Sequence, residues 1–224
     1  MKQTPVHDSH NPDLLTFMPA NAQRVLEVGC SSGALAREYK KINKECRYIG
    51  IDIDAEYTTL AQRHCDIAIC ADIEHPDFDV ASTGSGVDCW VFGDTIEHFR
   101  DPWKVLSEIR KVISPNGTIV ACIPNAQHWS VQTRLNKGLF QYEDSGLLDR
   151  THLRWFTRKT IFELFESTGY RVEDGMPRIF GADQAGLDPI LLNIRNMALA
   201  LGDDPEIAVE DAMPLQYVVR AVPV

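Results

Sequence analysis

The chain has no long apolar run and no closely paired cysteines. A membrane-spanning helix needs about 18 apolar residues in a row, and no such run occurs; residues 1–15 also contain no apolar signal core. The six cysteines are scattered without a C-x-x-C pair, a pattern typical of small buried thiols in a reducing compartment. We therefore expect a soluble, cytoplasmic protein without a membrane span.

Basic residues are scarce as well. The chain has 22 Lys and Arg against 32 Asp and Glu, a net charge of −10 at pH 7, which argues against a broad nucleic-acid-binding surface. Hydrophobic residues make up 44% of the 224 residues and charged residues 24%, so the composition is that of a globular chain with a full core. We expect one domain, residues 1–224, without repeats or low-complexity segments.

From residue 24 onward, short apolar runs alternate with stretches of helical spacing. Strands are expected at 24–28, 47–52, 66–72, 87–94, 117–124, 170–175 and 215–222, and the main helices at 33–41, 101–113 and 157–170. Continuous apolar strands separated by helices indicate a parallel sheet covered on both faces. The predicted fold class is α/β: a doubly wound, mostly parallel, seven-stranded Rossmann-like sheet.

Two stretches interrupt the alternation. Residues 124–156 follow the fifth strand and are rich in aromatic and charged side chains, whereas residues 176–213 contain an apolar helix near 189–201. Extra segments at the carboxyl edge of a sheet commonly shape a ligand site or an oligomer contact. We interpret 124–156 as a lid-like insert on the acceptor side and 176–213 as a helical insert; its apolar helix is explained equally well by a homodimer contact and by core packing.

The motif VLEVGCSSG, residues 25–33, follows the first strand. Glycine lets the backbone approach a ligand where a β-carbon would collide. Asp52 ends the second strand at a distance suited to gripping ribose hydroxyls, and Asp72 ends the third strand, where an adenine amino group is read with Ile73 against the ring. The dinucleotide motif G-x-G-x-x-G does not fit, because Ser31 and Ala34 stand at its second and third glycines.

The sequence resembles instead the E/D-x-G-x-G-x-G motif of class I S-adenosylmethionine-dependent methyltransferases, with Ser31 at the middle glycine, and the resemblance covers roughly residues 12–175 in motif order. It implies S-adenosyl-L-methionine as cofactor, with the glycine turn against its methionine part, Asp52 on the ribose and Asp72 at the adenine. The expected cofactor-binding residues are Glu27, Gly29, Cys30, Ser31, Gly33, Asp52, Ile53, Asp72, Ile73 and Gly93.

After the fourth strand, the segment FGDTIEHFRDPW (residues 92–103) carries the candidate catalytic residues Asp94, Glu97 and His98. Their spacing at i, i+3 and i+4 places them on one face of a helical turn. His98 is a candidate general base because its ordinary pKa of about 6.5 suits proton abstraction near neutrality. The three side chains are also candidates to bind a divalent metal that orients an acceptor hydroxyl, and a third interpretation gives them only structural roles.

The metal hypothesis has support from resemblance. D-x-x-E-H looks like the E-x-x-E-H of small-RNA ribose 2′-O-methyltransferases and of ubiquinone-pathway O-methyltransferases, which add a downstream histidine. His152 in THLRWFTR stands in a similar context. The resemblance implies a Mg or Mn site made by Asp94, Glu97, His98 and His152, with the shorter aspartate replacing a glutamate.

Residues 124–160 carry six basic and three acidic side chains, a basic island in an acidic chain that is a candidate landing place for phosphate. The island also holds aromatic rings suited to sugars or bases. Its block IPNAQHWS…LNKGLFQY…GLLDRTHLRWFT resembles methyltransferases associated with bacterial polysaccharide and glycan biosynthesis, which implies a sugar hydroxyl as acceptor. The expected acceptor-binding residues are Asn125, His128, Trp129, Arg154 and Trp155.

The predicted function is therefore transfer of a methyl group to a hydroxyl of a sugar, nucleotide sugar or glycan. Alternatives are O-methylation of a quinone, phenol or other small metabolite, and RNA ribose 2′-O-methylation, against which the net charge and the lack of an RNA-binding appendage argue. A non-catalytic nucleoside-binding module would be expected to lose polar residues at the chemical centre, yet Glu97 and His98 are present there.

Overall fold

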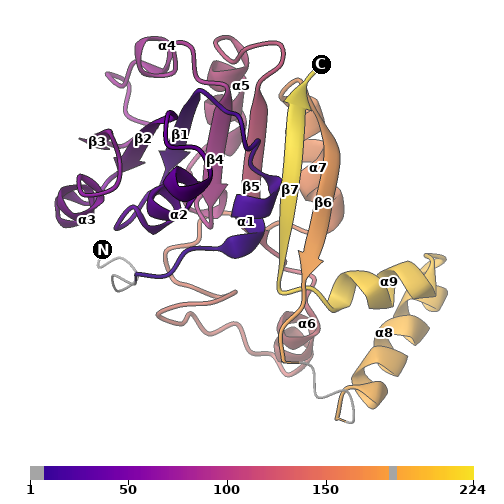
Figure 1. Cartoon of the computed structure of the whole chain (residues 1–224). Helices are drawn as coiled ribbons and strands as arrows, with labels where there is room; N and C mark the ends of the chain where they lie inside the picture. Colours follow the sequence, from indigo (N-terminus) through magenta and orange to yellow (C-terminus); the bar gives the residue numbers. More distant parts are fainter. Residues whose placement is uncertain (1–7, 182–185) are drawn as a thin grey trace.

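A computed structural model describes residues 8–181 and 186–224 of the chain. Seven strands form one sheet in the order β3-β2-β1-β4-β5-β7-β6 (Figure 1). The strands are β1 (Arg24–Val28), β2 (Arg47–Asp52), β3 (Ile67–Cys70), β4 (Cys89–Gly93), β5 (Thr118–Pro124), β6 (Tyr170–Arg178) and β7 (Gln216–Pro223). Strands β1 to β5 pair in parallel, whereas β7 is antiparallel to both β5 and β6. The predicted doubly wound, mostly parallel sheet is confirmed.

Helices cover both faces of the sheet. On one face, α1 (Pro12–Phe17), α2 (Ala34–Ile42) and α3 (Ala55–Ala61) bury Leu14, Tyr39 and Ala61 against one set of strand residues. On the other face, α5 (Pro102–Arg110) and α7 (Arg158–Ser167) bury Leu106 and Phe165 against the alternate set. Because successive strand residues point to opposite faces, the continuous apolar runs that predicted a doubly covered sheet supply both cores.

The carboxyl ends of the parallel strands are the functional edge of this sheet. From β1 the chain moves outward to β2 and β3 on one side, and it returns to β4 and β5 on the other side. Strand β1 thus borders β4 at a topological switch point, where ligands bind in open α/β sheets. The loops after β1, β2, β3 and β4 converge at this point.

Irregular segments and short helices line the same edge. Helix α6 (Trp129–Asn136) follows β5, while α8 (Asp188–Leu201) and α9 (Pro205–Ala212) connect β6 to β7; in Figure 1 these three helices lie where β6 ends and β7 begins. The predicted helix near 189–201 is therefore present. It buries Ile194 and Ala198 and leaves Leu192 and Leu199 exposed, so the homodimer contact stays a prediction.

Sequence reasoning missed four helices. They are α1, α4 (Val80–Thr83), α6 and α9. Each is eight residues long or shorter, which leaves too few helical turns for a clear apolar period. Within the described part of the chain, all six cysteines are free thiols, and five are buried. In the same residues, no helix is both long and apolar enough to cross a lipid bilayer.

Candidate functional site

A cavity of about 910 Å³ opens at the carboxyl ends of β1, β2 and β4. Residues that sequence reasoning assigned to the cofactor line it, with the exception of Gly33, whose neighbours Ser32 and Ala34 do line it. Asp94, Glu97, His98 and His152 line the same cavity. The structure therefore brings most of the expected cofactor residues and the expected chemical centre together around one open cavity.

The turn between β1 and α2 owes its shape to three residues with positive φ. Gly29 and Gly33 both have φ +78°, and Ser31 between them has φ +47°, a conformation that side chains other than glycine rarely adopt. A β-carbon on Gly29 would lie 2.5 Å from Oγ1 of Thr95. Ser31 thus adopts the left-handed conformation that the replaced glycine of the motif favours, and Gly29 is required by packing inside the protein as well as by its φ.

Glu27, the penultimate residue of β1, lines the cavity just before the glycine turn. Its Oε2 accepts a hydrogen bond from the hydroxyl of Tyr48 at 2.9 Å. Burial raises the pKa of Glu27 from 4.5 to about 8, against the opposing effect of that hydrogen bond. Burial therefore favours the protonated form of this carboxyl group.

Asp52 links the end of β2 to the glycine turn. Its Oδ2 accepts from the backbone N–H of Ser31 at 2.9 Å and its Oδ1 from that of Asp54 at 3.0 Å. Burial raises the pKa of Asp52 above its usual range, while these backbone donors lower it. The carboxylate is fixed beside the turn, as a ribose-binding carboxylate must be, and Ile53 lies exposed next to it in the cavity wall.

Asp72 lies in the cavity wall with Arg100. Oδ2 of Asp72 accepts from Nη2 of Arg100 at 2.7 Å, and Nε of the same guanidinium lies 3.6 Å from Glu74. Partial burial raises the pKa of Asp72, yet the hydrogen bond from Arg100 brings it below its usual range. Ile73 beside it is buried, so an ionised carboxylate and an apolar side chain share this wall.

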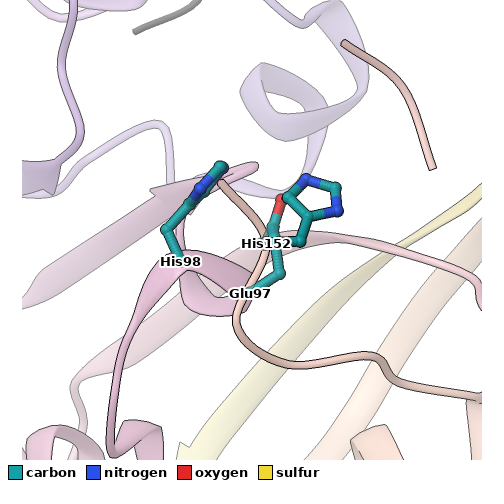
Figure 2. Close-up of side chains that lie close together, drawn as sticks. All are labelled: Glu97, His98 and His152. Atoms are coloured by element: carbon teal, nitrogen blue, oxygen red, sulfur yellow. The ribbon is translucent and has the colours of Figure 1, made fainter. Parts of the chain in front are cut away.

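The expected chemical centre contains a cluster of Glu97, His98 and His152, whose candidate ligand atoms all lie within 4.8 Å of one another. Glu97 and His98 belong to the short 3₁₀ helix η1 (Ile96–His98) after β4, whereas His152 comes from the loop before α7. Figure 2 shows the Glu97 carboxyl group reaching up beside the ring of His152. Nε2 of His152 lies 3.9 Å from Oε1 of Glu97, and the two imidazole rings meet edge-on with centroids 4.8 Å apart.

Glu97 is 1% exposed, and neither of its carboxyl oxygens has a hydrogen-bond partner among the described residues. Burial raises its pKa well above the usual range, and the neighbouring Asp94 carboxylate adds to this shift. Burial also lowers the pKa of His98 and of His152, which favours the neutral form of both rings. A buried acid without a partner beside two neutral imidazoles is the arrangement expected of a site that takes a proton or a cation.

Hydrogen bonds to the backbone define the tautomer of each imidazole. Nδ1 of His98 lies 3.1 Å from the carbonyl oxygen of Thr151, and Nδ1 of His152 lies 3.3 Å from that of Leu147. A carbonyl oxygen only accepts, so both Nδ1 atoms carry the hydrogen and both Nε2 atoms keep a lone pair.

Asp94 does not join this cluster, and the expectation that it shares a helical face with Glu97 and His98 is wrong. It precedes η1 with φ +52°, so the helical spacing does not extend back to it. Its exposed side chain accepts hydrogen bonds from Nε2 of Gln216 and, at 3.8 Å, from Sγ of Cys122. The residue still lines the cavity, on the side formed by β7.

The five residues expected to bind the acceptor do not line the cavity. Asn125 is fully buried, and its amide donates to the carbonyl oxygens of Asp211 and Pro214, so it holds the start of β7. His128 is buried as the N-cap of α6. Trp129 packs on His128, Trp155 packs on Phe140 and Tyr142, and Arg154 donates to the carbonyl of Arg100.

The basic island offers few unpaired arginines. Arg134 pairs with Glu143 at 2.8 Å, and Arg150 pairs with Asp144 at 2.7 Å. Arg158 binds the carboxylate of Asp211 with two nitrogens. Three of the six basic side chains thus form ion pairs, two of them with acidic residues of the same segment and Arg158 with Asp211 of α9.

Sequence reasoning missed two segments of the cavity wall. Ser9, His10 and Asn11 enter it from before α1, and Ser145 to Leu147 enter it from a turn whose flanks pair at Glu143 and Asp149. No local motif marks the first segment. Gly146 at φ +87° between short polar residues is a signal by which the second was recognisable as a turn.

Solved structures with the same fold are methyltransferases. The chain superposes on mitomycin 7-O-methyltransferase with a TM-score of 0.58 at 11% identity, covering 95% of this chain and 52% of that one. For the plantazolicin methyltransferase in complex with SAH, the TM-score is 0.57 at 16% identity, covering 90% and 76%. At these identities the likeness shows the fold alone, an α/β methyltransferase fold.

The family described as "Methyltransferase domain" matches residues 8–174, and the chain belongs to it. A protein of Mycolicibacterium smegmatis named as a probable S-adenosylmethionine-dependent methyltransferase is 29% identical over 172 residues, 73% of this chain and 58% of that protein. A ubiquinone biosynthesis O-methyltransferase of Paracidovorax citrulli is 28% identical over 105 residues, 45% of this chain and 43% of that protein. The chain thus spans about half the length of these relatives.

Proposed function

We propose that this chain is an S-adenosylmethionine-dependent O-methyltransferase whose acceptor is a hydroxyl of an uncharged small molecule, a sugar or glycan in the first instance. The observation that carries the proposal is the juxtaposition, around one cavity, of the glycine turn with Asp52 and of two imidazole Nε2 lone pairs beside a buried carboxyl group. Family membership supports the reaction, and the resemblance of the block after β5 supports the sugar.

The cavity wall fits the cofactor. S-adenosylmethionine carries a sulfonium and an ammonium group, and eight lining residues are acidic: Glu27, Asp52, Asp54, Asp72, Glu74, Asp94, Glu97 and Asp149. Asp52 is positioned for ribose hydroxyls, and Asp72 with Ile73 offers an acceptor and an apolar surface for the adenine. A cavity of about 910 Å³ is of the size that holds a cofactor together with a small acceptor. When bound, the cofactor supplies a methyl group on a positively charged sulfur.

His98 is the base of the proposed reaction. Its Nδ1 is committed to the carbonyl of Thr151, so Nε2 is the atom that takes the proton from the acceptor hydroxyl. Burial keeps the imidazole neutral and ready to accept a proton at pH 7. His152 presents a second Nε2 to the same space and orients the hydroxyl by accepting or relaying a hydrogen bond.

The charge of the cavity favours an acceptor without phosphate. Among the lining residues that the structure describes, Arg100 is the only arginine or lysine, and Asp72 and Glu74 already pair with it. A nucleotide-linked sugar or an RNA end would bring its phosphates toward carboxylates without a free cation to receive them. Within the proposed sugar class, free or neutral glycan hydroxyls are therefore favoured over nucleotide sugars.

The cluster of Glu97, His98 and His152 also fits a divalent metal ion. One buried carboxyl group without a partner and one ring nitrogen from each of two histidines, all within 4.8 Å of one another, make a donor set that suits Mn²⁺ better than Mg²⁺, which prefers oxygen ligands. Asp94 is not needed in this set. A metal held there would lower the pKa of the acceptor hydroxyl.

A phenol or quinol acceptor is the second candidate, and the relatives named as ubiquinone biosynthesis O-methyltransferases are the observation that favours it. The named pathway belongs to those proteins, of which the match covers less than half. A flat aromatic ring would suit the apolar lining residues Phe99, Leu147 and Leu215.

The test is transfer of labelled methyl from S-adenosylmethionine to a panel of free sugars, neutral glycans, nucleotide sugars, phenols and short RNA, each with and without a chelator. Label in free sugars or glycans is the expected result, with nucleotide sugars poorer acceptors. Label in phenols alone replaces the sugar proposal by the second candidate, and loss of label with chelator supports the metal. No transfer to any acceptor, combined with tight cofactor binding, supports the non-catalytic alternative.

A further inference from the structure

One loop, residues 147–154, makes the backbone contacts that hold the chemical centre in place. The carbonyl oxygens of Leu147 and Thr151 accept from the Nδ1 atoms of His152 and His98, respectively. In the opposite direction, the backbone N–H groups of Leu153 and Arg154 donate to the carbonyl oxygen of Glu97, at 2.8 and 3.0 Å. The loop and the 3₁₀ helix η1 are therefore tied to each other on both sides of the cluster.

Asp149 holds this loop in shape. Its Oδ1 accepts from the backbone N–H of Thr151 at 2.7 Å and from the Thr151 hydroxyl at 2.6 Å. Its own backbone N–H donates to the carbonyl of Gly146, and its carbonyl accepts from the N–H of His152. The side chain is 5% exposed and lines the cavity, yet both described side-chain contacts go to Thr151 rather than to either imidazole.

We propose that Asp149 is a positioning residue that acts through Thr151: by binding the backbone N–H and the hydroxyl of Thr151, it holds this residue so that its carbonyl oxygen lies against Nδ1 of His98, which keeps the lone pair of His98 on Nε2. Without this acceptor, neutral imidazole is free to carry its hydrogen on either nitrogen, and the Nε2–H tautomer offers no lone pair to an acceptor hydroxyl or a cation. The catalytic consequence rests on the proposed function, whereas the tautomer does not.

The tautomer is measured directly by two-bond ¹H–¹⁵N correlation spectra of the imidazoles of the full chain, at a pH where the rings are neutral. The signals of the seven histidines are assigned by single replacement, His98→Ala and His152→Ala among them. The wild-type protein is expected to show His98 with its hydrogen on Nδ1. An Nε2–H signal for His98 in the wild type overturns the proposal before any Asp149 variant is made.

Two variants of Asp149 and one matched control then test whether Asp149 determines the tautomer of His98. Asp149→Ala removes both contacts to Thr151 and is expected to give a mixture of His98 tautomers, while Asp149→Asn keeps an acceptor oxygen and is expected to retain the wild-type spectrum. Asp144→Ala, just before this loop, serves as control, because its exposed carboxylate pairs only with Arg150 among the described residues. A wild-type His98 tautomer in folded Asp149→Ala overturns the proposal.

Turnover supplies the second readout. Loss of a residue that orients a functional imidazole typically costs about 10- to 100-fold in activity. Asp149→Ala is expected to lower kcat in that range with an unchanged KM for S-adenosylmethionine. Asp149→Asn is expected to keep most of the wild-type kcat. If the wild-type chain transfers no methyl group, the proposed function fails, but the spectra still decide the role of Asp149.

Discussion

The two halves of the cavity are built in different ways. The cofactor half consists of strand ends and the turn at Glu27–Gly33, with Asp52 and Asp72 one strand further out each time. The acceptor half, made of Glu97, His98 and the loop 145–152, joins a 3₁₀ helix to a loop some 50 residues away, as in the contact of His98 with Thr151 across 53 positions. The first half is determined by local sequence, and the second depends on the docking of a long loop.

This difference predicts that the two halves respond separately to substitution. A change in the cofactor half is expected to alter cofactor affinity with little effect on saturated turnover, and a change in the acceptor half is expected to do the reverse. A variant that changes both cofactor affinity and saturated turnover would contradict this separation of the two halves.

The largest effect is expected from His98→Ala. Removing a general base typically costs about 10²- to 10⁴-fold in rate, so turnover with saturating acceptor should fall in that range while the dissociation constant of S-adenosylmethionine stays unchanged. Single-turnover assays and calorimetric titration measure the two quantities. The exposed His75, which does not line the cavity, supplies the control variant His75→Ala. Near-normal turnover of His98→Ala would remove both the base and the metal hypotheses.

Asp52→Ala tests the cofactor half. Hydrogen bonds to a charged group contribute about 1.5–3 kcal/mol, so the affinity for S-adenosylmethionine should fall by roughly 10- to 150-fold. Turnover at saturating cofactor should change much less, and Asp77→Ala, with its exposed carboxylate, should leave both unchanged. Equal cofactor affinity in Asp52→Ala and wild type would refute the ribose assignment.

Glu27→Gln tests the cofactor half through the pH dependence of protein stability. The folded-state pKa of Glu27 is raised to about 8 from 4.5, so its contribution to stability is fully present below about pH 4.5 and is lost as pH rises through about 8. Wild type should lose up to about 1.4 kcal/mol of unfolding free energy per pH unit across this window relative to Glu27→Gln. Urea unfolding of the two proteins from pH 5 to 8 checks this slope, with the exposed Glu45→Gln as control. If the unfolding free energies of wild type and Glu27→Gln change with pH in parallel, the raised pKa of Glu27 is contradicted.

The smallest effect is expected at Ser31, the non-glycine residue at positive φ in the cofactor half. Left-handed backbone costs an L-residue roughly 1–2 kcal/mol, part of which the greater freedom of an unfolded glycine offsets, so Ser31→Gly should stabilise the protein by less than about 1 kcal/mol. Ser31→Val should destabilise it, because a β-branched side chain tolerates this conformation least. Thermal unfolding ranks the three proteins, and a Gly variant less stable than Val would show that the φ value carries no strain.

Sequence reasoning predicted the fold and the cofactor half for one physical reason. Gly29, Asp52, Asp72 and Gly93 stand at the ends of β1 to β4 or within two residues of them, so the pairing of these strands brings the four positions to one edge of the sheet. The assignments to S-adenosylmethionine themselves stay predictions.

The acceptor half was only partly predictable. Glu97 and His98 were named from their residue types and spacing and His152 from the resemblance to families with a downstream histidine, and the three do lie together. Asn125 was placed at the acceptor because it follows β5, but the start of β7 packs there and uses its amide. Likewise, Asp94 was predicted to share a helical face with Glu97 and His98, but its positive φ interrupts the helical spacing. Such outcomes depend on contacts between distant segments, which local spacing does not encode.

Thr95 has a consequence for how the molecule moves. Its Oγ1 donates to the carbonyl oxygens of Val28 and Gly93, the terminal residues of β1 and β4, and it fills the space where Gly29 has no β-carbon. Thr95 therefore joins the glycine turn of the cofactor half to the helix η1 of the acceptor half. A displacement of one half is expected to displace the other. The loop 147–154 is itself hydrogen-bonded to η1, so both halves of the cavity share this common base.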